Sequence, residues 1–159
     1  MAYNKKYVPK TLTEKDKQIQ KKSIREKTER PKLESFKSKR SPFVERFEKK
    51  YGFKITDKSK IAKSLMTLTG INKVLEKGRG AYFSSGSRPN QTKDSWAFAR
   101  LASVLLFGKA ANVDRNELLK YGKGEIKKEA LKKYTHKMPN GTIMTGKKHD
   151  KNSKPLTKL

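Results

Sequence analysis

The chain has 159 residues and a formal net charge of +26, because 41 lysine and arginine residues face only 15 aspartate and glutamate residues. Only 33% of its residues are hydrophobic, well below the roughly 45–50% of ordinary globular domains. This composition excludes one apolar core that spans the whole chain, and it predicts a small core with basic extensions. The self-repulsion of such a chain favours a polyanionic or acidic partner.

Several classes of protein do not fit the sequence. It contains no cysteine, which excludes disulfides and thiolate metal ligands. Its longest apolar run, residues 96–107, is interrupted by Arg100 and Ser103 and is shorter than the ~20 residues that a membrane-spanning helix needs. The first ten residues lack the apolar stretch of a secretory signal. We therefore expect a soluble protein that is intracellular or embedded in a particle.

The expected fold is mainly α, a small helical core of short helices with long basic, largely extended N- and C-terminal arms. We expect a basic N-terminal arm at residues 1–40, a compact helical domain at residues 41–121, and a basic C-terminal helix and tail at residues 122–159. Positive charge is spread over all three regions rather than gathered in one tail.

The N-terminal arm begins with a polar helix, for which Thr13 is the expected N-cap. Extended chain is expected after Arg30-Pro31. Leu33 and Phe36 would be the anchors if this arm orders on a neighbouring surface. The alternative is a disordered basic tail, since the arm carries few apolar residues.

The compact domain is expected to start at Ser41-Pro42, an N-cap followed by proline at the first helical position. Phe43, Phe47 and Tyr51 follow at steps of four, and Gly52 is placed to end the helix. We interpret this aromatic stripe as core, the alternative being a platform on which bases stack.

Two short helices are expected next, at residues 59–68 and 71–77, with a break at Thr69-Gly70. Two helices joined by a tight turn resemble a helix-turn-helix motif. In a DNA-reading version, Asn72, Lys73 and Lys77 would face the groove. The alternative is an ordinary pair of packed helices with a glycine in the turn.

A loop is expected at residues 78–92, where Gly78, Gly80 and Gly86 permit positive φ angles. Its hydroxyl, guanidinium and amide groups precede a helix N-terminus, an arrangement suited to a phosphate or carboxylate. The alternative is an ordered loop whose polar groups cap nearby helices. The candidate partner- or anion-binding residues are Arg79, Ser84, Ser85, Ser87, Arg88, Asn90 and Gln91.

The central helix is expected at residues 95–107, started by Thr92 or Asp94, and it is apolar nearly all round. Arg100 is the exception and needs an acidic partner, for which Asp94 and Glu76 are candidates. The expected core residues of the domain are Phe43, Phe47, Tyr51, Leu65, Leu68, Trp96, Leu101 and Leu105.

The last elements are short. Asp114 and Glu117 are placed to form a capping box for a helix at residues 115–121. A lysine-rich helix is expected at residues 125–134, and the turn at residues 139–141 favours a small hairpin. His136 and His149 lie too far apart in the sequence for a recognisable metal site, and we expect them to be solvated. No catalytic constellation stands out.

Three segments carry a resemblance to a known family. The string AYFSSGSRPNQT within residues 78–92, together with Ser95-Trp96, Ala99-Arg100 and Gly108-Lys109-Ala110, resembles a domain of unknown function found in large DNA viruses, chiefly algal and giant viruses. Residues 36–52 and 6–17 resemble the segments that precede this domain. The resemblance covers roughly residues 6–121 and implies a virus-encoded protein that forms part of the particle. It brings no activity that can be assigned to particular residues.

Two classes of function follow. The first is a viral structural protein, a minor capsid or cement component that bridges larger capsid subunits on the inner face of the shell, with other capsid proteins and an anionic membrane surface as its expected partners. The alternative is a sequence-independent DNA-binding or genome-packaging virion protein. Both place the protein in the virion, and in host cytoplasm or nucleus during assembly. No enzymatic activity, cofactor, metal ion or small-molecule substrate is expected.

Overall fold

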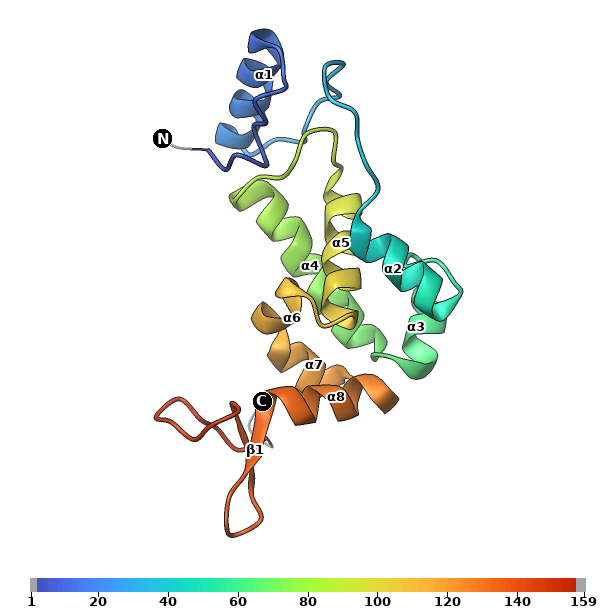
Figure 1. The fold of residues 1–159 in the computed structure, drawn as a ribbon, viewed down its shortest axis with the longest axis vertical. Coiled ribbons are helices and arrows are strands. Elements are labelled where there is room, and N and C mark those ends of the chain that lie inside the picture. The colour runs from blue at the N-terminus through green and yellow to red at the C-terminus, as the bar shows by residue number, and fades with distance from the viewer. Residues whose placement is uncertain (1–2, 157–159) are drawn as a thin grey trace.

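A computed structural model describes residues 3–156, so the first two and last three residues of the expected arms lie outside the described part. The fold is mainly helical, as expected (Figure 1). The elements in chain order are α1 (Glu14–Arg25), α2 (Pro42–Tyr51), α3 (Lys58–Ser64), α4 (Leu68–Ser84), α5 (Lys93–Leu105), α6 (Lys109–Val113), α7 (Arg115–Tyr121), α8 (Gly124–Tyr134), β1 (Thr135–Lys137) and β2 (Ile143–Thr145).

The long helices α4 and α5 pack along one another in the middle of the molecule (Figure 1). Their closest approach requires a glycine, because a Cβ atom added at Gly78 would lie 2.7 Å from the Cα atom of Ala97. Gly78 is therefore a helix-packing residue, and α4 continues through it to Ser84. The expected short helix at residues 71–77 is wrong for this reason, since a close tertiary contact can use a glycine that would otherwise break the helix.

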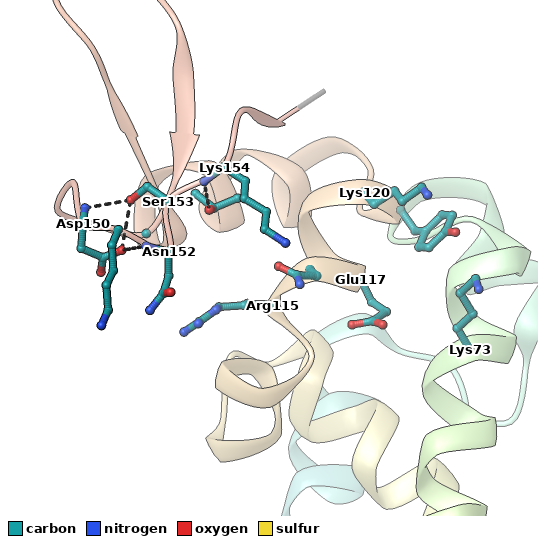
Figure 2. A pocket seen from close by; sticks show the side chains of 13 residues that line it. Lys73, Arg115, Glu117, Lys120, Asp150, Asn152, Ser153 and Lys154 are labelled. Carbon is teal, nitrogen blue, oxygen red and sulfur yellow. Dashed lines mark hydrogen bonds between the residues drawn. The ribbon is translucent and has the colours of Figure 1, made fainter. Parts of the chain in front are cut away.

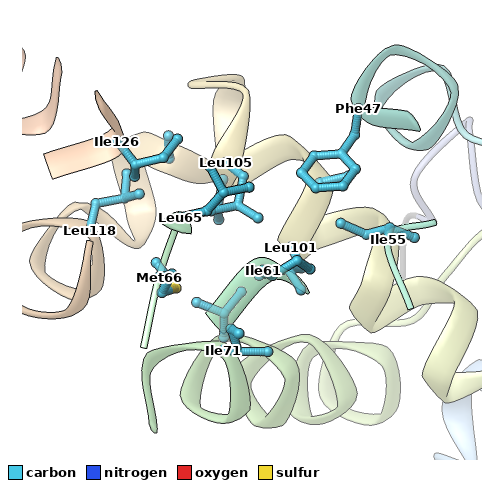
Figure 3. Packing of buried hydrophobic residues seen from close by; sticks show 14 of the residues in the cluster. Phe47, Ile55, Ile61, Leu65, Met66, Ile71, Leu101, Leu105, Leu118 and Ile126 are labelled. Atoms are coloured by element: carbon cyan, nitrogen blue, oxygen red, sulfur yellow. The ribbon is translucent and has the colours of Figure 1, made fainter. Parts of the chain in front are cut away.

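The buried core lies between α4, α5 and the shorter helices around them (Figure 3). Its largest fully buried apolar side chains include Phe47, Ile61, Met66, Ile71, Leu75, Leu101, Leu105, Leu118 and Leu119. Ile126 and Ala130 of α8 belong to the same cluster, so the core extends past residue 121. The backbone N–H of Lys123 donates to the Leu65 carbonyl (2.8 Å) and ties the start of α8 to the end of α3.

Most of the expected core residues lie in or against this cluster. Phe47, Leu65, Leu101 and Leu105 are buried in it, and Phe43 and Tyr51 pack against it. Leu68 is 50% exposed, because it occupies the first turn of α4 while Ile71, Val74 and Leu75 take the inner face. Trp96 is half-buried outside the cluster and meets the Tyr7 ring edge-on, with the ring centroids 5.8 Å apart.

Three helix starts agree with the sequence. The Thr13 side chain accepts from the Asp16 N–H at the start of α1, and Ser41-Pro42 precedes α2, which ends at a left-handed Gly52. Thr92 and Ser95 form a capping box at the start of α5. The expected capping box of α7 is wrong, because the Asp114 side chain makes no cap hydrogen bond and pairs with Arg100 instead.

The ends of the chain are more ordered than expected, so long extended arms are not confirmed. At one end of the molecule, α1 and the residues after it fold back on the chain between α4 and α5 (Figure 1). At the other end, β1 and β2 form the expected antiparallel hairpin, with His136 opposite Met144.

Candidate nucleic-acid interface

The chain between α4 and α5, residues 85–92, is the first region to consider, because the sequence predicts a binding loop there. It is shorter than expected, since Arg79 and Ser84 belong to α4. Of the three glycines, Gly86 alone has a positive φ, +95°. We call residues 85–92 the docking loop and residues 3–36 the N-terminal segment, since the first holds the second.

Asn90 holds the end of the N-terminal segment. Its Oδ1 atom accepts from the Leu33 N–H (2.6 Å), and its Nδ2 group donates to the carbonyls of Leu33 (3.2 Å) and Phe36 (3.0 Å). Asn90 has a left-handed backbone, with φ of 61°, a conformation that asparagine tolerates better than most residues. Of the two expected arm anchors, Leu33 is buried and Phe36 is half-buried, and both contact this chain's own loop.

Tyr82 at the end of α4 holds the middle of the segment. Its fully buried hydroxyl accepts from the Arg30 N–H (2.6 Å) and donates to the Gln91 carbonyl (2.8 Å). The Arg30 guanidinium donates to the Tyr82 carbonyl (2.9 Å) and lies over the Tyr82 ring, 4.7 Å from its centroid. Burial lowers the pKa of Arg30, although Tyr82 opposes the shift. The face of the aromatic ring compensates a buried cation in part.

Gln20 on α1 completes the attachment. Its fully buried side-chain amide donates to the Tyr7 carbonyl (2.9 Å) and to the Ser87 carbonyl (3.1 Å). Ile24 on the same helix lies against Gly86, where an added Cβ would meet it at 3.2 Å. The N-terminal segment is therefore joined to the docking loop at Gln20 and at residues 33–36, and to the end of α4 at Arg30.

The predicted site residues separate into two groups. Asn90, Gln91 and Ser87 use their polar groups within the molecule, and Arg79 pairs with Asp94 (2.8 Å). Ser84, Ser85 and Arg88 are exposed, and within residues 3–156 none of their side chains makes a hydrogen bond or ion pair to the protein. The seven residues do not converge on one open anion site.

A group of charges centred on the buried Asp114 joins α4, α5 and α7. The carboxylate of fully buried Asp114 receives two bonds from the Arg100 guanidinium, both 2.8 Å long. The predicted partners Asp94 and Glu76 are wrong, because the fold brings the start of α7 against α5. Lys77 reaches Glu117 (2.6 Å) and Asp114 (3.5 Å). The hydrogen bonds that Arg100 donates to Asp114 raise the pKa of Arg100. At Lys77 the effect of burial is outweighed by Glu117 and Asp114, so the pKa of Lys77 is raised too.

These contacts occupy two of the three residues that the helix-turn-helix interpretation of α3 and α4 assigns to DNA. Lys77, expected to face DNA, is engaged with Asp114 and Glu117. Asn72 accepts a hydrogen bond from Lys58 (3.3 Å). Lys73 alone of the three lies at an open cavity, which the sequence did not indicate.

That cavity has a volume of about 680 Å³ and lies between α4, α7 and the turn that follows β2 (Figure 2). We call it the basic pocket, because five cationic side chains from three separate elements line it: Lys73, Arg115, Lys120, Lys151 and Lys154. Its two acidic lining residues are Glu117, already bonded to Lys77, and Asp150, which accepts from the Asn152 N–H (2.8 Å).

The turn that forms one wall of the basic pocket is fixed to the hairpin. The Thr145 N–H donates to the Lys154 carbonyl (2.8 Å), and the Lys154 N–H donates to the Thr145 hydroxyl (2.9 Å). None of the five cations forms a salt bridge to an acid within the part of the chain that the structure describes. They are therefore available to an external anion. The sequence does not indicate that these five cations lie together, because they come from α4, α7 and the turn after β2 and meet only in the folded chain.

Comparison with known proteins adds one finding. A family model matches residues 2–120. The chain belongs to the family of unknown function DUF5824. No curated protein and no solved structure matches the chain. The family match covers the N-terminal segment, the docking loop and α2 to α6, and it ends within α7, so two of the five cations of the basic pocket lie beyond it.

Two further features bear on chemistry. Within residues 3–156, no three histidine, cysteine, aspartate or glutamate side chains gather where they could hold a metal ion. Among the helices of the same residues, none is long and apolar enough to cross a membrane.

Proposed function

We propose that this member of DUF5824 binds duplex DNA without sequence preference, as a structural rather than an enzymatic component of a DNA-virus particle. The observation that carries the proposal is the basic pocket, where five cations and only two carboxylates line one cavity, and none of the five cations forms a salt bridge within residues 3–156. Lysine and arginine that contact phosphates release condensed counterions, and this release drives sequence-independent binding. The viral setting comes from the sequence resemblance.

The charge distribution supports DNA over a small anionic ligand. The net charge of +26 belongs to the whole chain, so a long polyanion can engage the pocket and the surrounding surface together. The pocket cations come mainly from lysine, a flexible point charge suited to phosphate contacts. Neither the pocket nor its rim combines several aromatic rings with polar groups in the manner of a site that reads bases.

The test compares two variants that lose the same charge. One replaces Lys73, Arg115 and Lys120 with glutamine, and the control replaces Lys22, Arg25 and Lys32, which are exposed near the other end of the molecule. Fluorescence anisotropy with a labelled duplex at several salt concentrations gives the affinity and its salt slope. We expect the pocket variant to bind more weakly than the control, with a slope that is smaller by about 0.9 for each phosphate that it no longer neutralises.

Equal losses of affinity in both variants would show that binding rests on diffuse charge rather than on the basic pocket. Binding to one DNA sequence that persists at high salt would contradict the proposal, as would the absence of any binding at low salt. Circular dichroism of both variants checks that the fold is retained.

A second candidate function is the bridging of larger capsid subunits from the inner face of the shell. One observation favours it: the docking loop already binds the backbone of a distant chain segment, the turn at residues 33–36, through the side chain of Asn90. A surface of this kind suits proteins that exchange chain segments with neighbours. Fractionation of purified particles separates the two functions, since a bridging protein would stay with the shell and a packaging protein with the genome.

A further inference from the structure

His136 and His149 form a close pair near the basic pocket, although their spacing in the sequence indicated no metal site. His136 is in β1, and His149 is in the turn that also carries Lys151 and Lys154. The His136 Nε2 atom and the His149 Nδ1 atom are 3.3 Å apart. Two ring nitrogens at this distance either share a proton or bind one ion together.

The orientation of the His136 ring selects its free nitrogen. The Nδ1 atom of His136 lies 2.6 Å from the Gly146 carbonyl, so this nitrogen carries the hydrogen and donates it. The Nε2 atom then presents its lone pair toward His149. The Gly146 backbone is fixed in turn, because its N–H donates to the Tyr134 carbonyl (2.7 Å). A backbone carbonyl that orients one imidazole nitrogen is the usual support of a metal-binding histidine.

We infer that His136 Nε2 and His149 Nδ1 are two ligands of a divalent zinc ion, with water in the remaining positions. In a tetrahedral zinc site with bonds of about 2.0–2.1 Å, two ligand nitrogens are separated by about 3.3 Å, the distance found here. Neutral imidazole is a favoured ligand of zinc. His149 is exposed, so the ion can enter from solvent without a change in the fold.

The ion would join the hairpin to the wall of the basic pocket. It closes a loop of chain from residue 136 to residue 149 and so restricts the turn that presents Lys151 and Lys154. Metal that binds only the folded arrangement stabilises it by mass action. The inference does not depend on DNA binding, since both ligands lie outside the basic pocket.

The lysine residues around the two histidines should make zinc affinity depend on ionic strength. The exposed side chains of Lys137, Lys147 and Lys148 flank the two ligands, and they repel a divalent cation. Salt screens repulsion between exposed charges. Zinc affinity is therefore expected to rise with ionic strength, whereas DNA affinity is expected to fall.

The experiment is a calorimetric titration of the full-length protein with zinc chloride at pH 7.5 and two salt concentrations. We expect one zinc ion per chain, removed by a chelator, with tighter binding at the higher salt concentration. The variants are His136→Ala, His149→Ala and His149→Asn. The asparagine amide can still donate a hydrogen bond to His136 Nε2, but it is a poor zinc ligand, so this variant preserves the turn and separates metal binding from hydrogen bonding.

We expect each of the three variants to lose the zinc, and Lys148→Ala to bind it more tightly than the native chain. Zinc that binds the two alanine variants as tightly as the native protein would place the metal elsewhere and overturn the inference. So would a native protein that takes up no zinc. Loss of zinc in His149→Ala but not in His149→Asn would show that the turn, rather than ligation, controls binding, and would also overturn it.

Discussion

The helical body, residues 42–134, and the N-terminal segment that docks on it are held by different forces. The body buries a continuous apolar cluster between α2, α3, α4, α5, α7 and α8. In the N-terminal segment, the buried apolar side chains are Leu12 and Leu33. The other buried side chains of the segment are polar or charged: Gln20, Ser23 and Arg30. Apolar packing tolerates small displacements, whereas hydrogen bonds depend on geometry. The body should therefore unfold as one unit, and the segment should detach before it.

The largest effect is expected inside the body. Asp114→Asn leaves the Arg100 guanidinium half-buried without its carboxylate, and breaking such a pair typically costs about 3–5 kcal/mol. Chemical denaturation monitored by circular dichroism measures the decrease in stability. The control is Asp94→Asn, which breaks the exposed pair with Arg79 and should cost less than about 1 kcal/mol. Similar decreases in the two variants would contradict a structural role for the buried charges.

The next effect tests the crossing of α4 and α5. Gly78→Ala places a methyl group 2.7 Å from the Ala97 backbone, and overpacking of this kind costs about 1–3 kcal/mol. Gly80→Ala on the same helix meets nothing within 4 Å and should stabilise the protein by about 0.5–1 kcal/mol, because alanine favours a helix. Thermal melts of the two variants should shift in opposite directions, and a shared direction would contradict the close crossing of the two helices.

A smaller and local effect is expected at the docking loop. Asn90→Gly keeps the positive φ angle but removes the three hydrogen bonds to Leu33 and Phe36. Hydrogen exchange of residues 28–36 should become faster, while the midpoint of body unfolding changes little. If the whole protein instead melts earlier by one cooperative transition, the segment and the body are a single unit.

Acid should loosen the segment before the body. The Asp16 carboxylate accepts from the hydroxyl and the backbone N–H of Ser35, which lowers the pKa of Asp16. A lowered pKa in the folded state means that this contact stabilises the segment above the unfolded pKa of about 3.9, and that the contribution is lost as the pH falls through the lower folded value. Proteolysis of the segment should increase below about pH 4, and the increase should be weaker in Asp16→Asn.

The smallest effect on stability is expected at Arg88. Its side chain is exposed and unpaired within the described residues, so Arg88→Ala should change the free energy of unfolding by less than about 0.5 kcal/mol. If the docking loop also contacts a capsid subunit, the same variant should reduce incorporation into particles. Lower stability would place Arg88 among the internal contacts of the loop.

Local signals allowed much of the secondary structure to be predicted. Thr13 and Thr92 mark helix starts through capping hydrogen bonds of their own side chains, and Pro42 marks the start of α2 as the proline of its first turn. Features that depend on distant contacts could not be found this way. From the sequence alone, Gly78 indicates a helix end, and its role becomes clear only from its contact with Ala97. Asn90 is hydrogen-bonded to Leu33, which lies 57 residues away in the sequence.

The candidate site was harder to predict than the fold. The loop residues are ordered and polar, as expected, but most of their polar groups serve internal contacts. Arg100 contacts Asp114, and His136 contacts His149, because the fold brings α5 against the start of α7 and brings β1 against the turn after β2. Pairing of this kind is set by topology, which composition and spacing do not contain.

Helix α8 lies beyond the region that the family model matches, but it packs into the core of that region. The family match ends at residue 120, but Ile126 and Ala130 help to close the core, and Lys123 is bonded to the end of α3. A chain shortened to the matched region would present Leu118 and Leu119 to water and should associate or precipitate. In this chain, therefore, a segment beyond the family match covers apolar surface that the matched residues leave open.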